Sequence, residues 1–212
     1  MQVLEKDTSV VNETSIEVNF SPLLRRYTLE EFWALPEPED RSHYELIGGY
    51  LFMVPGPNPP HGDVASRMMR SLLKFLLDNN IDGQEYFPRE AIYLSGESPT
   101  YLEPDLMYVS RELREKMGEK RTSADIVFEF QSRSTSVYDR TTKADTYLAL
   151  GVRELWLINP VTGTIEVRQA SKVGEILVWK IAKYSRGQQA KSRVLEGYEV
   201  SVDKLFAGLI QE

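Results

Sequence analysis

The longest periodic pattern of hydrophobic residues lies between Gly62 and Asn79. Apolar side chains recur there every three or four positions, which places them on one side of a helix: Val64, Met68, Leu72, Phe75 and Leu76. Basic side chains fall on the opposite side: Arg67, Arg70 and Lys74. The pattern predicts a long amphipathic helix with a basic stripe. Such a stripe is typical of a solvated helix face, and the alternative is a surface that faces DNA.

Closer to the N-terminus, the pattern predicts a short helix and a β-hairpin. Thr28 can cap a helix whose first turn is acidic and which stops at Pro36. Two apolar runs, residues 44–47 and 50–54, then flank the pair Gly48-Gly49. A two-residue glycine turn between such runs is typical of a hairpin.

The second half of the chain alternates between strand and helix patterns. Strands are predicted at residues 85–94, 106–109, 125–131, 154–158, 164–168 and 175–184. Helices are predicted from Ser134 or Ser136 to Leu150, closed by Gly151, and at residues 202–209. The order strand, helix, strand across residues 125–158 is a crossover unit, so its two strands should be parallel. The pattern as a whole predicts an α/β fold.

Length and composition indicate one domain. A chain of 212 residues that is 42% hydrophobic suits a single core better than two small ones. Residues 1–21 are polar and lack a clear period, so we interpret them as a flexible arm before a single domain, residues 22–212. No apolar run reaches the roughly 18 residues of a membrane span, and no signal-peptide pattern opens the chain. We therefore expect no membrane segment and a cytoplasmic location.

The amino-acid content also restricts the chemistry. The chain has no cysteine and two histidines, which excludes disulfides, thiol nucleophiles and zinc–thiolate sites. Any metal ion must therefore be held mainly by oxygen, which favours Mg²⁺, Mn²⁺ or Ca²⁺. The net charge of -7 argues against broad adhesion to a polyanion but is compatible with an acidic metal site beside a local basic rim.

Two acidic residues stand out because of their strand context. Asp105 begins the apolar run Leu106-Met107-Tyr108-Val109, and Glu129 interrupts the run Ile126-Val127-Phe128. A carboxylate within a buried strand loses hydration energy unless a cation or a hydrogen-bond donor meets it. Two such acids on neighbouring strands could share a divalent ion that polarises a phosphoryl oxygen and activates water. The alternative is two solvent-facing acids at strand ends.

These residues also carry a resemblance to a known superfamily. Pro104-Asp105 followed by Glu129-x-Gln131 resembles the PD-(D/E)XK nucleases. A closer resemblance, over roughly residues 27–205, is to the Uma-type family of restriction-endonuclease-like domains. It rests on motifs in this order: Tyr44-Glu45-Leu46-Ile47-Gly48-Gly49, Pro104-Asp105, Phe128-Glu129-Phe130-Gln131-Ser132-Arg133-Ser134-Thr135, Asp139-Arg140-Thr141-Thr142-Lys143 and residues 147–158.

The resemblance implies a restriction-endonuclease-like core: a mixed central β-sheet flanked by helices, with an N-terminal helix and hairpin. It also implies a phosphodiester site in which Asp105 and Glu129 hold Mg²⁺ or Mn²⁺. Gln131 departs from the superfamily pattern, because a lysine usually stands at that position. In this branch the lysine appears on the following helix, as Lys143, where it can act electrostatically. The alternative for Lys143 is a solvated helix residue.

Further site residues are implied by the same resemblance. Glu45 is expected to complete the metal shell, or alternatively to pair with an arginine within the hairpin. His61 is expected at the rim of the site, or alternatively as a structural hydrogen-bonding group. Arg133 and Arg140 are the preferred phosphate contacts. Tyr147, one turn after Lys143, is expected to pack or to orient the ammonium group.

The resulting hypothesis is a metal-dependent phosphodiesterase, a DNA endonuclease that uses carboxylate-bound Mg²⁺ to activate water. The alternative is a catalytically degenerate domain of the same fold that binds nucleic acid or a protein, for which Gln131 is the sequence motive. A third hypothesis is hydrolysis of another phosphate ester. A homodimer is compatible with the first hypothesis, because cutting both strands of a duplex requires two sites.

Overall fold

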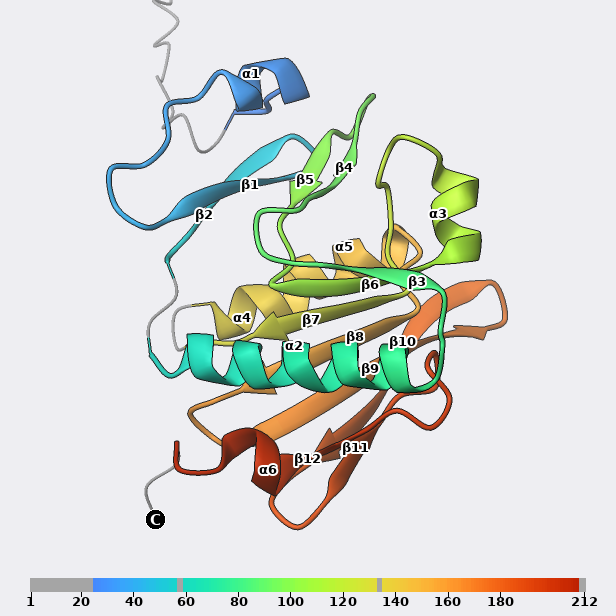
Figure 1. The fold of residues 1–212 in the computed structure, drawn as a ribbon. Coiled ribbons are helices and arrows are strands. Elements are labelled where there is room, and N and C mark those ends of the chain that lie inside the picture. Colours follow the sequence, from blue (N-terminus) through green and yellow to red (C-terminus); the bar gives the residue numbers. More distant parts are fainter. Residues whose placement is uncertain (1–24, 57–58, 133–134, 210–212) are drawn as a thin grey trace, which may run out of the picture.

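The computed structural model describes residues 25–56, 59–132 and 135–209, so the predicted arm, residues 1–21, lies outside these ranges. Its centre is a six-stranded mixed sheet (Figure 1). The strand order is β10 (Ile176–Tyr184), β9 (Thr164–Val173), β8 (Glu154–Asn159), β7 (Ile126–Phe130), β6 (Leu106–Ser110) and β3 (Gly83–Tyr86). Within this sheet β7 and β8 pair in parallel, and the other neighbours are antiparallel.

Helices cover both faces of this sheet. The amphipathic helix α2 (His61–Asp78) lies across one face (Figure 1). The crossover between β7 and β8 covers the other face through α4 (Ser136–Tyr138), the π-helical turn η2 (Asp139–Lys143) and α5 (Ala144–Ala149). The predicted parallel crossover and the predicted fold class, a mixed sheet flanked by helices, are therefore confirmed.

The two faces of β7 bury different cores. Phe128 packs with α2 and Trp156 in one hydrophobic cluster, whereas Val127 packs with α5 in another. Successive side chains of a strand point to opposite faces, so Glu129 falls on the same face as Val127. On β6 the same alternation places Asp105 on the face of Met107, which belongs to the α5 cluster. The alternation therefore directs both carboxylates toward the crossover helix.

A second, four-stranded sheet lies beside the first. Its order is β2 (Tyr50–Val54), β1 (His43–Ile47), β5 (Thr100–Leu102) and β4 (Ile92–Leu94). Gly48 and Gly49 have φ values of 58° and 87°, as the predicted hairpin turn requires. Helix α1 (Leu29–Trp33) packs on this sheet and begins with the predicted cap, because Thr28 and Glu31 form a capping box. The N-terminal helix and hairpin are confirmed.

The remaining elements are short: α3 (Arg111–Met117), β11 (Gln189–Lys191), β12 (Glu199–Ser201) and α6 (Val202–Phe206). Of these, the sequence pattern predicted α6 alone, and it ends before residue 209. No helix in the described part of the chain combines the length and the apolar character needed to cross a bilayer.

One prediction about element boundaries was wrong, and one predicted helix has its expected bounds but is irregular inside them. The strand expected at residues 85–94 is two strands in different sheets, because the chain turns at Arg89, whose φ is +76°. The helix expected from Ser134 or Ser136 to Leu150 is interrupted by the π-helical turn. Ser134 lies outside the described residues, and α4 follows Thr135, whose side chain makes no capping hydrogen bond.

Candidate active site

Antiparallel pairing of β6 and β7 brings the two predicted acids together. Leu106 pairs with Phe128, and extending this register by one position sets Asp105 opposite Glu129. The backbone N–H of Phe130 donates to Asp105 Oδ2 at 2.8 Å. Both acids line one small pocket of about 50 Å³. They are therefore neighbours at a shared pocket, rather than separate solvent-facing acids.

The predicted lysine reaches the same place from the crossover helix. Lys143 Nζ lies 2.9 Å from Glu45 Oε1 and 3.0 Å from Glu129 Oε1. Its side chain is 3% exposed, so the alternative of a solvated helix residue is wrong. Lys143 ends the π-helical turn, and such turns commonly occur at functional sites.

Glu45 contacts Lys143 from the second sheet. This fully buried carboxylate also accepts the N–H of Glu103 at Oε1, 2.8 Å away, and the hydroxyl of Tyr138 at Oε2, 2.9 Å away. The partner of Glu45 is a lysine rather than the arginine of the alternative interpretation. Because both of its oxygens are engaged, these contacts favour a role in holding Lys143 over direct ligation of a metal ion.

Glu129 has a second donor besides Lys143. The hydroxyl of Tyr147 donates to Glu129 Oε1 at 2.6 Å, and both side chains are buried. Tyr147 was expected to pack or to orient the ammonium group, and the structure shows that its hydroxyl contacts the carboxylate. Burial and neighbouring carboxylates keep the pKa of Tyr147 well above its ordinary value, so the phenol remains a hydrogen-bond donor.

The pocket holds more negative than positive charge. Burial opposes the charged form of Lys143, but the carboxylates of Glu129, Glu45, Asp139 and Asp105 outweigh it and raise the pKa of Lys143 well above its ordinary value. Burial also raises the pKa of Glu129, and the nearby carboxylates of Asp105, Asp139 and Glu45 raise it further. The ammonium group of Lys143 lowers this pKa but does not cancel the rise. Four carboxyl groups thus share one ammonium group, which is an environment that attracts a further cation or a proton.

Asp139 shows this excess most clearly. Burial, opposed by Lys143, raises its pKa from 3.8 to about 6. Between these values the folded chain binds more protons than the unfolded chain, so stability falls as pH rises from about 4 to 6. Asp139→Asn removes this loss and should stabilise the protein at pH 7.5 by on the order of 2 kcal/mol relative to its effect at pH 4.

Urea unfolding at both pH values would measure this difference. Asp145→Asn provides the matched control, because Asp145 is exposed on α5 of the same crossover helix. An Asp139→Asn effect that is the same at pH 4 and pH 7.5 would contradict the prediction.

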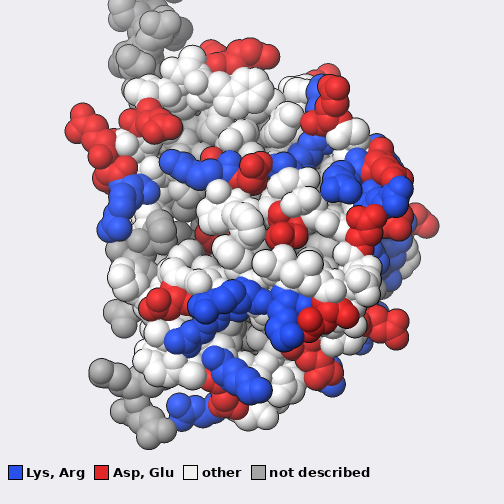
Figure 2. All heavy atoms as spheres, in the orientation of Figure 1, with Lys and Arg blue, Asp and Glu red and all other residues white. Residues whose placement is uncertain are grey.

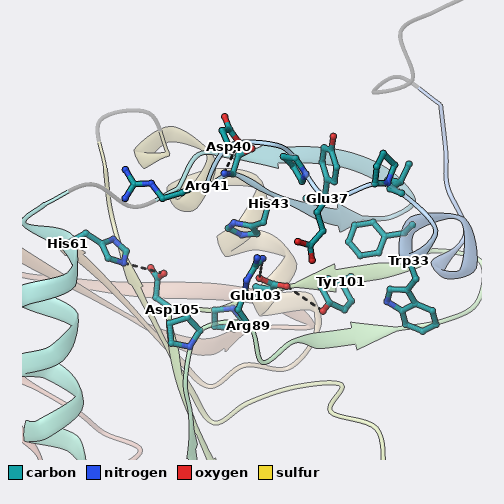
Figure 3. Close-up of a pocket in the computed structure, with 18 residues that line it drawn as sticks. Trp33, Glu37, Asp40, Arg41, His43, His61, Arg89, Tyr101, Glu103 and Asp105 are labelled. Carbon is teal, nitrogen blue, oxygen red and sulfur yellow. Dashed lines mark hydrogen bonds and ion pairs between the residues drawn. The ribbon is translucent and has the colours of Figure 1, made fainter.

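His61 lies at the rim of the site, as expected. Its Nδ1 is 3.1 Å from the carbonyl oxygen of Phe130, so Nδ1 carries the proton of this hydrogen bond. Its Nε2 is 3.5 Å from Asp105 Oδ1 (Figure 3). His61 therefore contacts one predicted metal ligand and the strand that carries the other.

Arg140, one of the two residues predicted to contact phosphate, is held by contacts within the protein. Arg140 Nη1 lies 2.6 Å from Glu166 Oε2, and its Nη2 donates to Gln131 Oε1 at 3.2 Å. Arg140 thus joins the crossover helix to β9 within the protein. Gln131, at the superfamily's usual lysine position, is buried and also donates to the carbonyl of Ser136. Arg133 lies outside the described residues.

The basic stripe of α2 is partly occupied by contacts within the protein. Figure 2 shows basic side chains gathered in a band over this helix. Arg67 Nη1 donates to the carbonyls of Leu205 and Ala207, and Lys74 pairs with Asp78 at 2.6 Å. At one end of the stripe Arg67 is therefore bonded to the C-terminal segment, and at the other end Lys74 forms a surface ion pair.

Comparison with protein families assigns the chain. The family model Uma2, described as "Putative restriction endonuclease", matches residues 29–203. The chain belongs to the Uma2 family. The match spans the whole pocket, and the resemblance drawn from the sequence motifs is confirmed.

A solved structure supports the same fold. The Uma2 chain is similar to a crystal structure described as "a putative nuclease belonging to DUF820" from Anabaena variabilis, with a TM-score of 0.66 and 21% identity. The similarity covers 86% of this chain and 99% of that one. No curated protein matches the chain.

The donor set of this Uma2 site fits a hard divalent cation. Two carboxylates, Asp105 and Glu129, line the pocket, and the excess of negative charge favours a cation there. Within the described ranges, no three His, Asp or Glu side chains form a complete metal-binding group. A protein contribution of two carboxylates suits Mg²⁺, which usually keeps several waters.

Sequence reasoning did not identify three residues of the site. Tyr138 and Glu103 support Glu45, and Asp139 adds a fourth acid to the pocket. Asp139 begins the motif that ends at Lys143, and Tyr138 directly precedes it, so their proximity to this motif could have indicated a place in the site. Glu103 contributes its backbone N–H, which no residue pattern indicates.

Proposed function

We propose that this Uma2 protein is a metal-dependent nuclease that hydrolyses phosphodiester bonds of DNA. The observation that carries the proposal is the convergence of Asp105, Glu129 and Lys143 at one pocket, with Lys143 Nζ 3.0 Å from Glu129 Oε1. The description of the family and that of the similar crystal structure, a nuclease, support the same reaction class.

Asp105 and Glu129 are the residues that would hold Mg²⁺ or Mn²⁺. Such an ion, when bound, polarises a phosphoryl oxygen and lowers the pKa of a coordinated water. The chain orients both carboxylates in advance: the N–H of Phe130 binds Asp105 Oδ2, and the hydroxyl of Tyr147 binds Glu129 Oε1. Glu129 therefore keeps its second oxygen available to the pocket, and Oδ1 of Asp105 lies 3.5 Å from Nε2 of His61.

Lys143 would supply positive charge to the phosphoryl group as negative charge develops on it. The raised pKa keeps its ammonium group protonated at neutral pH. Because the group is buried and held by Glu45, its charge is fixed in place and needs little reorganisation during the reaction. Glu45 and Tyr138 act through Lys143 and are positioning residues.

The non-catalytic alternative rests on Gln131, which cannot supply a charge. In the structure Gln131 supports Arg140, while a buried ammonium group at the pocket comes from Lys143. A domain that had lost catalysis would not need to keep a lysine buried among four acids, which is costly unless the charges are balanced. The placement of Lys143 thus favours the nuclease over the degenerate domain.

Cleavage assays test the proposal directly. Purified protein should cut a mixed panel of single-stranded and duplex DNA with Mg²⁺ or Mn²⁺ and should stop with EDTA. Asp105→Asn should lower the rate at least about 100-fold, since it removes one negative ligand while keeping an oxygen for the N–H of Phe130. Asp145→Asn, exposed on α5, should cut as the parent does. Full activity of Asp105→Asn, or no cleavage by the parent, would refute the proposal.

A further inference from the structure

A cavity of about 570 Å³ lies next to the carboxylate pocket, with helix α1 at one end (Figure 3). The segment that joins α1 to β1 forms one side, and residues 103–105, just before β6, form another. Four residues line both this cavity and the carboxylate pocket: His43, His61, Glu103 and Asp105. The cavity therefore borders the proposed reaction site, and a substrate group next to the scissile phosphate would lie beside it.

The far part of the cavity is aromatic. Four rings line it: Phe32, Trp33, Tyr44 and Tyr101. Phe32 and Tyr101 hold each other, with ring centroids 4.9 Å apart. Trp33 is 56% exposed although it is a large apolar side chain. An exposed indole beside packed rings offers a flat surface on which another planar group can stack.

Among the charged side chains that line the cavity, four carboxylates outnumber two guanidinium groups. Glu37 points its carboxylate into the cavity, and Glu103 lies at its floor (Figure 3). Within the described residues, Nε2 of His43 is the buried side-chain nitrogen or oxygen without a hydrogen-bond partner. Negative charge disfavours a phosphate in this space, whereas carboxylates accept the amino and imino groups of nucleobases. Arg41 and Arg89 also line the cavity.

We propose that this cavity receives one unstacked nucleobase of the strand whose phosphate lies at Asp105 and Glu129. The inference rests on the proposed nuclease function and specifies its substrate. Aromatic side chains stack bases of any sequence, so the site selects an accessible base rather than a particular one. A base within a duplex must first leave its stack, so single-stranded or locally unpaired DNA is the favoured substrate.

Binding without cleavage tests the inference. Fluorescence anisotropy in EDTA would compare a short oligothymidylate with an abasic phosphodiester chain of the same length. Trp33→Ala should weaken binding of the oligothymidylate by about 5-fold to 100-fold, the range expected for one stacked base. Binding of the abasic chain should change less than about twofold, because it offers phosphates and no base to stack.

Two variants separate stacking from a loss of structure. Trp33→Phe keeps an aromatic face and should retain most of the affinity for the oligothymidylate. Leu77→Ala removes a comparably exposed apolar side chain from α2, outside the cavity, and should bind as the parent does. The oligothymidylate should also quench the tryptophan emission of the parent, and this quenching should be absent in Trp33→Phe.

The outcomes distinguish this inference from the nuclease proposal. If the parent cuts DNA but Trp33→Ala binds the oligothymidylate and the abasic chain as the parent does, the base site is refuted and the nuclease proposal stands. If binding of oligothymidylate depends on Trp33 but no metal ion supports cleavage, the nuclease proposal fails and the base site stands. If Trp33→Ala loses the same factor of affinity for the oligothymidylate and for the abasic chain, the base site is also refuted, because the indole would then contact the backbone.

Discussion

Replacement of Lys143 by methionine is expected to lower the free energy of unfolding by about 3–5 kcal/mol. Methionine fills a similar volume, but it leaves Glu45 and Glu129 buried without their shared cation. Burial raises the pKa of Glu129 and Lys143 opposes this rise, so without the lysine Glu129 binds a proton more readily in the folded chain, and the loss should be larger at pH 8 than at pH 5. Urea unfolding at these two pH values measures it.

Two comparisons isolate the charge. Lys143→Met combined with Glu129→Gln should recover part of the lost stability, because one of the two unpaired carboxylates is gone. Lys74→Met removes an exposed lysine from the ion pair with Asp78 and should cost less than about 1 kcal/mol. A Lys143→Met chain as stable as the Lys74→Met chain would show that the buried ammonium group is not a structural requirement.

Glu129→Gln is expected to lower metal-dependent cleavage by about 1,000-fold or more while the fold is retained. The amide oxygen can still accept the hydroxyl of Tyr147, and Lys143 keeps its contact with Glu45. What disappears is the negative charge that a divalent ion needs in this pocket. Burial raises the pKa of Glu129, so removing its ionisable group relieves the cost of keeping it charged.

Rates with Mn²⁺ and thermal unfolding with and without Mn²⁺ provide the measurements. The parent should gain stability from the ion, and Glu129→Gln should not. Glu154→Gln is the matched control, because Glu154 is also buried on a central strand but contacts Trp156 and the N–H of Arg193. Cleavage lost equally in both variants would point to a general effect of removing buried acids and not to a role of Glu129 in metal binding.

Much of the fold could be predicted because the deciding patterns are local. The glycine pair sets the hairpin by allowing positive φ, and the spacing of Val64, Met68 and Leu72 sets α2. The strands on either side of the crossover helix each contain an apolar run, residues 126–128 and 155–158. Once the crossover is recognised, parallel pairing follows from its connection, and the family motifs indicate which acids and which lysine meet.

The rest depended on contacts between distant segments. Glu45 lies far from Lys143 in sequence. Their contact exists because the second sheet packs against the crossover helix, and no local pattern indicates it. Arg140 looked available for phosphate, but Glu166 on β9 engages it. No helical period in the sequence indicates the π-helical turn at Asp139–Lys143.

The ammonium group of Lys143 joins the two sheets, since Glu45 belongs to one and Glu129 to the other. The site is therefore completed only when the two sheets pack together. Before the hairpin docks, Lys143 can pair with Glu129 but not with Glu45. Newly made or partly opened molecules would lack a finished centre. Under the proposed nuclease function, this requirement would restrict cleavage to fully folded protein.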